Sequence, residues 1–184
     1  MRSRLARIVP LLAMTACALT QPTPQTHYYL LAIQGTAPGH LPAPVRVHPF
    51  TIDPALAGER IAYQTHPNRL DRYTFHRWAT DPRAVVTTAV RDYLESVASS
   101  SGTPLEVDGH IRRLFERDEE TGRSGVLTLD LTVRQGDRGL LAHTYDENEP
   151  SVKAGPEAAV EALSRALGRI LDDVIGRLDT VRRH

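Results

Sequence analysis

The sequence predicts an α+β fold in which an antiparallel sheet carries two amphipathic helices. Short runs alternate apolar and polar residues between turn residues, which is typical of hairpins. Two longer segments repeat apolar residues at helical spacing. Consecutive hairpins favour antiparallel pairing, and each helix needs a sheet to cover its apolar face. Strands and then a helix occur twice along the chain, so we expect two halves of similar order.

The first half contains four predicted strands. The run HYYLLAI is rich in residues that favour strands and ends at Gly35, and a loop with three prolines follows. Val45 and Val47 then alternate with polar residues. Two further runs flank His66-Pro67-Asn68, which predicts a hairpin. These strands are predicted at residues 27–33, 45–49, 60–65 and 69–75.

The first helix is predicted to begin at Pro82. Asp81 can cap it, and proline is favoured at the first helical position. The serines at 99–101 and Gly102 end it. The apolar residues at helical spacing are Val85, Val86, Ala89, Val90, Tyr93, Leu94 and Val97.

The second half repeats the order with three strands and a helix. Residues 127–133 show the clearest alternation in the chain, and residues 135–139 form a turn. The charged segment 117–123 is predicted to be a solvated loop at a hairpin tip. The strands are predicted at 105–111, 127–133 and 140–145, and the helix runs from near Pro156 to Leu178.

Composition excludes several classes of protein. The chain has 184 residues, with 22 basic and 22 acidic side chains, so nothing indicates binding of nucleic acid. No apolar run approaches the roughly 20 residues that a membrane-spanning helix needs.

The N-terminal segment predicts a signal peptide over residues 1–16. Three arginines precede a short apolar stretch, and the small residues Thr15 and Ala16 suit a signal peptidase. Removing these three arginines from the 22 basic residues leaves 19 against 22 acidic residues, a formal net charge of −3.

The chain's one cysteine, Cys17, is predicted to carry a lipid. Met14-Thr15-Ala16-Cys17 resembles a bacterial lipobox, although Leu is usual where Met14 stands. The alternatives are an unmodified secretory signal with a chance cysteine, or a buried structural thiol. A lone free thiol is a liability in an oxidising compartment, which disfavours both. Diacylglycerol and palmitate-type acyl chains on Cys17 would anchor the protein essentially permanently.

The predicted organisation has three parts. Residues 1–16 are the signal peptide, residues 17–26 are the lipidated cysteine and a flexible tether rich in Pro and Thr, and residues 27–184 form one α+β domain. Ala18 follows the cysteine in place of the Asp that retains lipoproteins in the inner membrane. We therefore expect an anchor in the outer membrane, with the domain on its periplasmic face.

The sequence resembles the ABC-type transport auxiliary lipoproteins, the PqiC-like outer-membrane lipoproteins of MCE-domain lipid transport systems. The resemblance rests on the order and spacing of motifs, and it departs from the family at Met14 and in the charged segment 117–123. The matching stretches are YYLL, VRVHPFTIDPALAGERIAYQTHPNRLDRY, HRWATDPRAVVTTAVRDYLES, VLTLDLTVRQGDRGLLAHTYD and AAVEALSRALGRILDDVIGRL. It implies an auxiliary subunit of a phospholipid transport system that maintains membrane integrity, with an MCE-domain protein as partner. Phospholipid and a second copy of the chain are further partners that we consider.

No motif in the sequence indicates catalysis, a cofactor or a metal. The eight histidines form neither HExxH nor a pair at helical ligand spacing, and no GxSxG is present. Lipid would consume the thiol of Cys17. We therefore expect no enzyme activity. A structural or assembly-factor lipoprotein of the envelope remains the alternative function, and a hydrolase with an unrecognised site is a third class.

Aromatic and basic residues gather around the predicted hairpin and the approach to the first helix. Two interpretations stand: core packing where the hairpin meets the helix, or a surface that contacts a partner or lipid. The aromatic residues are Tyr63, Tyr73, Phe75 and Trp78, and the arginines are Arg69, Arg72 and Arg77. The candidate partner-binding residues are Arg69, Arg72, Tyr73 and Trp78.

Overall fold

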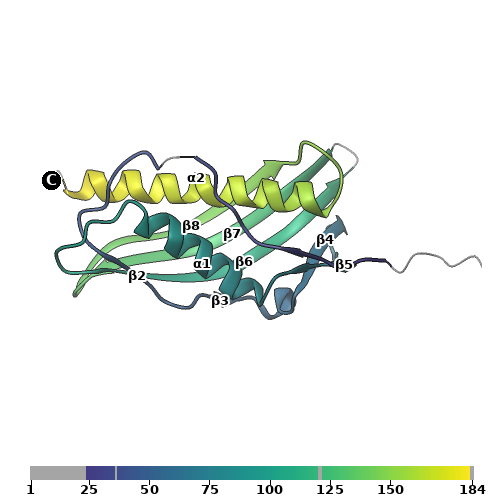
Figure 1. Ribbon diagram of the computed structural model, residues 1–184, viewed down its shortest axis with the longest axis horizontal. Helices are drawn as coiled ribbons and strands as arrows, with labels where there is room; N and C mark the ends of the chain where they lie inside the picture. Colours follow the sequence, from purple (N-terminus) through teal and green to yellow (C-terminus); the bar gives the residue numbers. More distant parts are fainter. Residues whose placement is uncertain (1–23, 36, 120–121, 183–184) are drawn as a thin grey trace, which may run out of the picture.

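The computed structural model describes residues 24–35, 37–119 and 122–182 and combines one sheet with two α-helices (Figure 1). The predicted signal peptide 1–16, the predicted lipid site Cys17 and most of the predicted tether 17–26 lie outside the described residues. Within them, the model contains strands followed by a helix, twice, as the sequence predicts.

The described residues form eight strands and two α-helices, with a short 3-10 helix between β3 and β4. The first half contains β1 (His27–Tyr29), β2 (Val45–Val47), β3 (Thr51–Ile52), η1 (Pro54–Leu56), β4 (Arg60–His66), β5 (Arg69–Trp78) and α1 (Pro82–Glu95). The second half contains β6 (Leu105–Glu119), β7 (Gly122–Gln135), β8 (Arg138–Pro150) and α2 (Pro156–Arg182).

The sheet is mixed, so the prediction of an antiparallel sheet is wrong in part. The path of strands is β1-β5-β4-β6-β7-β8, and β2 and β3 also pair with β6. The hairpins β4–β5, β6–β7 and β7–β8 are antiparallel, whereas β1 runs parallel to β5 and β2, β3 and β4 run parallel to β6. The reason is connectivity: β4 and β6 are separated by β5 and α1, and such crossover connections join parallel strands.

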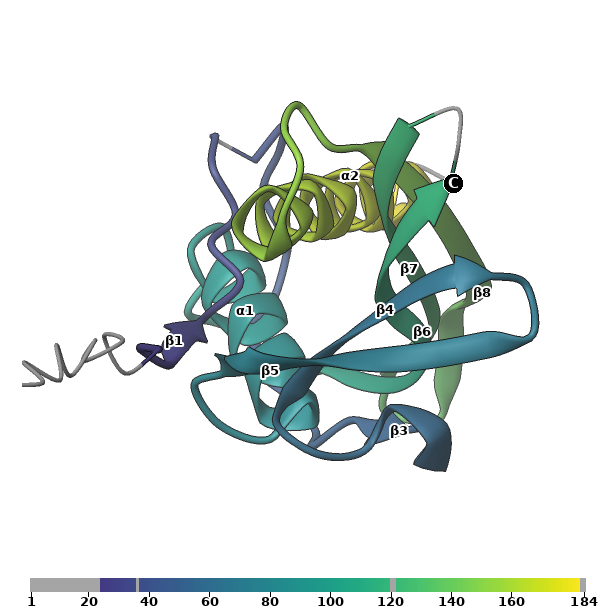
Figure 2. The same cartoon turned by 90° about the vertical axis from the view of Figure 1, so that its right-hand side faces the viewer.

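Both helices lie on the same side of the sheet, which we term the inner face. Viewed from the end, the sheet bends between β6 and the β4–β5 hairpin, and the helices lie within the bend (Figure 2). α2 packs along β7 and β8, and α1 packs on β2 and beside α2. Fully buried side chains of the core include Ile111, Leu127, Leu129 and Leu131. No helix in the described ranges is long and apolar enough to cross a membrane.

Two segments differ from the sequence prediction. Strand β1 ends at Tyr29, and the described residues between Leu30 and Pro44 form no helix or named strand where the chain crosses the helices. The predicted charged loop at 117–123 is largely strand, because β6 reaches Glu119 and β7 starts at Gly122. A cross-strand ion pair joins Asp118 to Arg123 at 2.7 Å, and cross-strand pairs of opposite charge stabilise such a hairpin.

Candidate functional site

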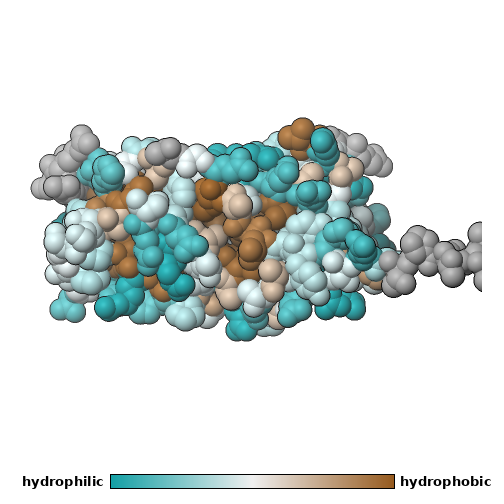
Figure 3. Space-filling view, in the orientation of Figure 1, coloured by the Kyte–Doolittle hydropathy of each residue, from teal (hydrophilic) through white to brown (hydrophobic). Residues whose placement is uncertain are grey.

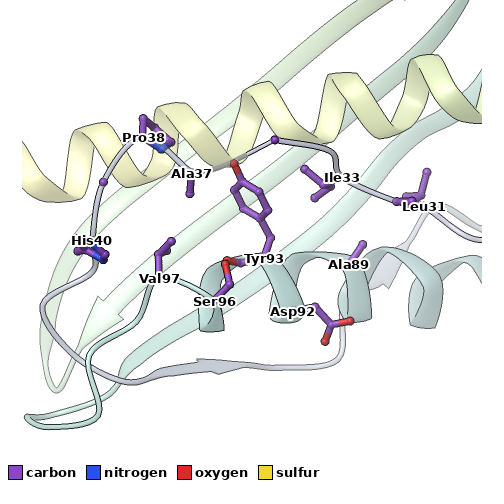
Figure 4. Close-up of a pocket in the computed structure, with 13 residues that line it drawn as sticks. Leu31, Ile33, Ala37, Pro38, His40, Ala89, Asp92, Tyr93, Ser96 and Val97 are labelled. Atoms are coloured by element: carbon purple, nitrogen blue, oxygen red, sulfur yellow. The ribbon is translucent and has the colours of Figure 1, made fainter.

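A groove lies between the irregular segment 31–40 and helix α1, and it is the main candidate for a binding site (Figure 4). Its volume is about 760 Å³, within the range of roughly 300–1,000 Å³ that small-molecule sites occupy. Most lining side chains are aliphatic or small. The lining residues are Leu31, Ala32, Ile33, Gly35, Ala37, Pro38, Gly39, His40, Ala89, Asp92, Tyr93, Ser96 and Val97.

Contacts with both helices fix the segment that forms one wall of the groove. The amide of Ala32 donates to Ser164 Oγ of α2 at 3.2 Å. Farther along, the amide of Leu41 donates to the carbonyl of Val97 at 2.9 Å, just beyond α1. Gly168 lets the segment approach α2 closely, since a Cβ there would stand 3.1 Å from Ile33 Cγ2. The wall is therefore held at both ends, and the groove is part of the folded structure.

Tyr93 supplies the aromatic side of the groove and links the two helices. Its hydroxyl donates to Asp172 Oδ1 at 2.5 Å. Burial of the phenol, followed by this hydrogen bond, raises the pKa of Tyr93 to about 12. The phenol is therefore neutral at physiological pH. Figure 3 shows apolar side chains gathered in the middle of the face where α1 and the crossing segment lie in Figure 1.

A second cluster of polar side chains lies on the inner face near the β4–β5 hairpin. Glu116 of β6 has no exposed surface, and Tyr73 Oη donates to its Oε2 at 2.5 Å. Arg123 Nη1 lies 3.5 Å from Glu116 Oε1. Burial, and then the hydrogen bond to the carboxylate, raise the pKa of Tyr73. These contacts pair a buried charge inside the protein and leave it little capacity to bind a ligand.

The sequence matches a protein family described as the ABC-type transport auxiliary lipoprotein component over residues 28–175. The chain belongs to this family. The matched range begins in β1 and ends within α2, so it includes every strand and both walls of the groove. As a family member, the protein is an auxiliary lipoprotein component of a transport system, which implies transporter partners and association with the cell envelope.

Solved structures with similar folds support this auxiliary lipoprotein's architecture. A crystal structure of a Xanthomonas campestris protein of the DUF330 family has a TM-score of 0.72 and 15% identity, covering 85% of this chain and 97% of that chain. A second structure, of an uncharacterized protein, has a TM-score of 0.66 and 13% identity, covering 84% and 99% of the two chains. At these identities the likeness shows the fold alone. No curated protein matches the sequence.

The four predicted partner-binding residues of the auxiliary lipoprotein differ in how far their side chains are exposed. Trp78 is 2% exposed and belongs to the core, so its side chain presents no surface to a partner. Tyr73 is half-buried against Glu116. Arg72 donates to the carbonyls of Ala55 at 2.6 Å and Arg60 at 3.2 Å. Thus only Arg69 remains largely exposed. It pairs with Asp71, with 2.6 Å between Nε and Oδ2.

The sequence predicts no metal site, and the structure describes the grouping of possible ligands for part of the chain. They contain no group of three or more His, Cys, Asp and Glu side chains that could hold a metal ion. His27 stacks on His76, with ring centroids 5.2 Å apart. Burial, and then repulsion by His27, lower the pKa of His76. Tyr29 Oη lies 2.8 Å from His76 Nδ1, so this pair is part of the hydrogen-bonded inner face.

The groove was not among the sequence predictions for this auxiliary lipoprotein. Its signal in the sequence is Leu31 and Ile33, which continue an apolar run beyond the end of β1. On α1, Ala89 and Tyr93 stand on the flank of the apolar stripe and are only half-buried. Apolar positions that extend past a strand, or beside a helix stripe, therefore mark the groove.

Proposed function

We propose that this auxiliary lipoprotein is held at the periplasmic face of the outer membrane by lipid on Cys17 and serves an MCE/ABC-type phospholipid transport system that maintains membrane integrity. The observation that carries the proposal is the family match across residues 28–175. The lipobox-like sequence ending at Cys17 supports the anchor. In this proposal the protein acts by position and contact, without a reaction of its own.

The groove between segment 31–40 and α1 is the proposed lipid contact. Its aliphatic lining suits one acyl chain of a phospholipid, and burial of apolar surface would supply the binding energy. Asp92 and Ser96 also line it and offer polar groups to the polar part of a lipid. Sites for small ligands commonly combine an apolar lining with a few polar groups in this way.

Filling the groove tests the lipid contact. Ala89→Trp places an indole in the groove, and Ala84→Trp is the matched control, because Ala84 is exposed on the same helix. Phospholipid extracted with the purified Ala89→Trp protein should fall to the background level, whereas the Ala84→Trp protein should retain as much lipid as the wild type. Equal lipid in all three proteins would exclude the groove as the lipid site.

Purification of the lipidated chain from cross-linked envelopes tests the function. We expect an MCE-domain protein to co-purify, and to be lost when Cys17→Ala removes the anchor. Recovery of outer-membrane protein assembly factors in its place would favour the alternative, a structural or assembly-factor lipoprotein. Labelled palmitate still present on the Cys17→Ala protein would contradict the anchor itself.

A further inference from the structure

Three exposed apolar side chains and an arginine lie on β1 and β5, or directly after β1, near the predicted tether. Among the described residues, four large hydrophobic side chains are exposed, and three of them belong to this group. Tyr28 is 64% exposed, Leu30 63% and Phe75 40%. We refer to Tyr28, Leu30, Phe75 and Arg77 as the β1–β5 patch.

The sheet register places Tyr28 and Arg77 together on its outer face. β1 and β5 are parallel, with Tyr28 directly beside Arg77, and neighbouring strands lie about 4.8 Å apart. The pairing of β5 with β4 shifts register between Arg72 and Arg77, and Phe75 is exposed within this stretch, two residues before Arg77. Leu30 directly follows β1, is exposed, and borders a hollow beside α2 together with Val160 and Arg165. His27 and His76, which precede Tyr28 and Arg77, stack on each other on the opposite face of the two strands.

Arg77 has hydrogen-bonding capacity that contacts among the described residues leave unused. Its Nε is buried, and no hydrogen-bond partner for that atom lies within the described part of the chain. Its Nη1 lies 3.7 Å from Glu59 Oε2, a long ion pair. A guanidinium flanked by apolar side chains can extend its charged end toward phosphate while its stem stays in an apolar environment.

The position of the patch identifies what covers it. Cys17 precedes His27, the first residue of β1, by ten residues, which span at most about 35 Å when extended. In Figure 1 the described chain begins at the end of the molecule where β1 and β5 lie. A lipid anchor on Cys17 would therefore hold this end close to the bilayer. Tyr and Arg side chains are also enriched at membrane–water interfaces.

We propose that the β1–β5 patch lies against the periplasmic leaflet of the membrane and orients the domain on it. Leu30 and Phe75 enter the apolar boundary, Tyr28 lies at the level of the headgroups, and Arg77 pairs with lipid phosphate. This inference rests on the proposed lipid anchor. The anchor fixes the distance to the membrane, and the patch fixes which side of the domain faces it.

Site-specific labelling of the full lipidated protein tests the orientation. Cys17 is the chain's only cysteine and lipid consumes its thiol, so one introduced cysteine takes a fluorescent label uniquely. Leu30→Cys reports on the patch. Asp137→Cys is the control, in the turn between β7 and β8 at the opposite end of the sheet. Both proteins carry an environment-sensitive fluorophore in vesicles of phosphatidylethanolamine and phosphatidylglycerol.

In vesicles, the label at residue 30 should emit at a shorter wavelength than the same fluorophore attached to a short peptide in buffer without detergent. Spin-labelled lipid in the vesicles should quench its fluorescence. The label at residue 137 should do neither. Tyr28→Ser with Phe75→Ser, both exposed positions, should return the label at residue 30 toward its emission in water. If both labels emit as they do in water while the proteins float with the vesicles, the proposed membrane contact is overturned. The proposed lipid anchor would still stand.

Two further outcomes separate this inference from the proposed function. Shielding of residue 30 only after a purified MCE-domain protein is added would assign the patch to a protein partner and overturn the membrane contact. Failure of both labelled proteins to float with vesicles would contradict the lipid anchor, and the orientation would be overturned with it.

Discussion

Tyr93 of α1 donates a hydrogen bond to Asp172 of α2, with 2.5 Å between Oη and Oδ1. The same kind of contact occurs twice more. Tyr145 of β8 donates to Asp173 of α2 at 3.0 Å. Tyr73 of β5 donates to Glu116 of β6 at 2.5 Å. Three tyrosine–carboxylate hydrogen bonds therefore join the helices and strands of the inner face, and each requires a neutral phenol.

We expect the protein to lose stability at alkaline pH. Burial, with the carboxylate hydrogen bond next, raises the pKa of Tyr73, Tyr93 and Tyr145 above the ordinary value of 10.0, to about 12 for Tyr93. A raised folded-state pKa stabilises the folded state below pH 10, and this stabilisation is lost as the pH rises through the folded-state value. Thermal melts from neutral pH to about pH 12 should show a falling Tm. Tyr93→Phe should lower the Tm at neutral pH and lessen its alkaline fall, whereas a Tm independent of pH would contradict the prediction.

Glu116→Ala should destabilise the protein by about 1–3 kcal/mol, because the half-buried hydroxyl of Tyr73 loses its acceptor, while Arg123 keeps its ion pair with Asp118. Glu116 has no exposed surface and contacts both Tyr73 and Arg123. Glu119→Ala is the control in the same strand, since Glu119 is exposed, and it should change stability by less than about 0.5 kcal/mol. Denaturant unfolding measures the free energy of unfolding of the Glu116 and Glu119 variants. Equally small losses in the two variants would show that the contacts of Glu116 contribute little to stability.

The starts of both helices were predictable because their signals are local, whereas α1 ends at Glu95, before the predicted end at the serines 99–101. Asp81 caps α1 by accepting from the amide of Arg83 at 2.9 Å, and Pro82 is the first helical residue, as the sequence indicates. The partner of each strand was not predictable. An alternating pattern shows which side chains are buried, but it does not say whether β4 lies beside β5 alone or also beside β6. The prediction of purely antiparallel pairing failed at those non-local contacts.

The candidate site was less predictable than the fold. Trp78 and Arg72 lie in the same aromatic and basic stretch as Arg69, yet Trp78 is 2% exposed and Arg72 donates to the carbonyl of Ala55. Sequence composition cannot distinguish an arginine that holds a loop from one that meets a partner. The groove depends on how segment 31–40 crosses two helices, and that path is set by tertiary contacts such as Ala32 with Ser164.

Gly125→Ala should destabilise the protein by about 1–3 kcal/mol through overpacking. A Cβ at Gly125 would stand 2.8 Å from the backbone nitrogen of Leu163 in α2, so the helix would have to move away from β7. Gly176→Ala is the matched control, because a Cβ there meets nothing within 4 Å. In an exposed helix position this change should stabilise by up to about 1 kcal/mol. Two unfolding curves that shift in the same direction would contradict the close-packing argument.

Because the β4–β5 hairpin is the predicted partner surface, we expect Arg69→Glu to weaken capture of the proposed MCE-domain partner without unfolding the protein. Arg69 is largely exposed, and exposed charges change stability by under about 0.5 kcal/mol. Reversal of a charge at a contact costs several kcal/mol of binding. Arg72→Glu cannot test the contact, because it removes two hydrogen bonds to backbone carbonyls and should itself destabilise the fold. Arg138→Glu is the control at the far end of the sheet.

A pull-down with the purified MCE-domain protein measures capture, and a melting curve checks that each variant is folded. Equal capture by the Arg69→Glu and Arg138→Glu proteins would show that the contact lies away from the hairpin.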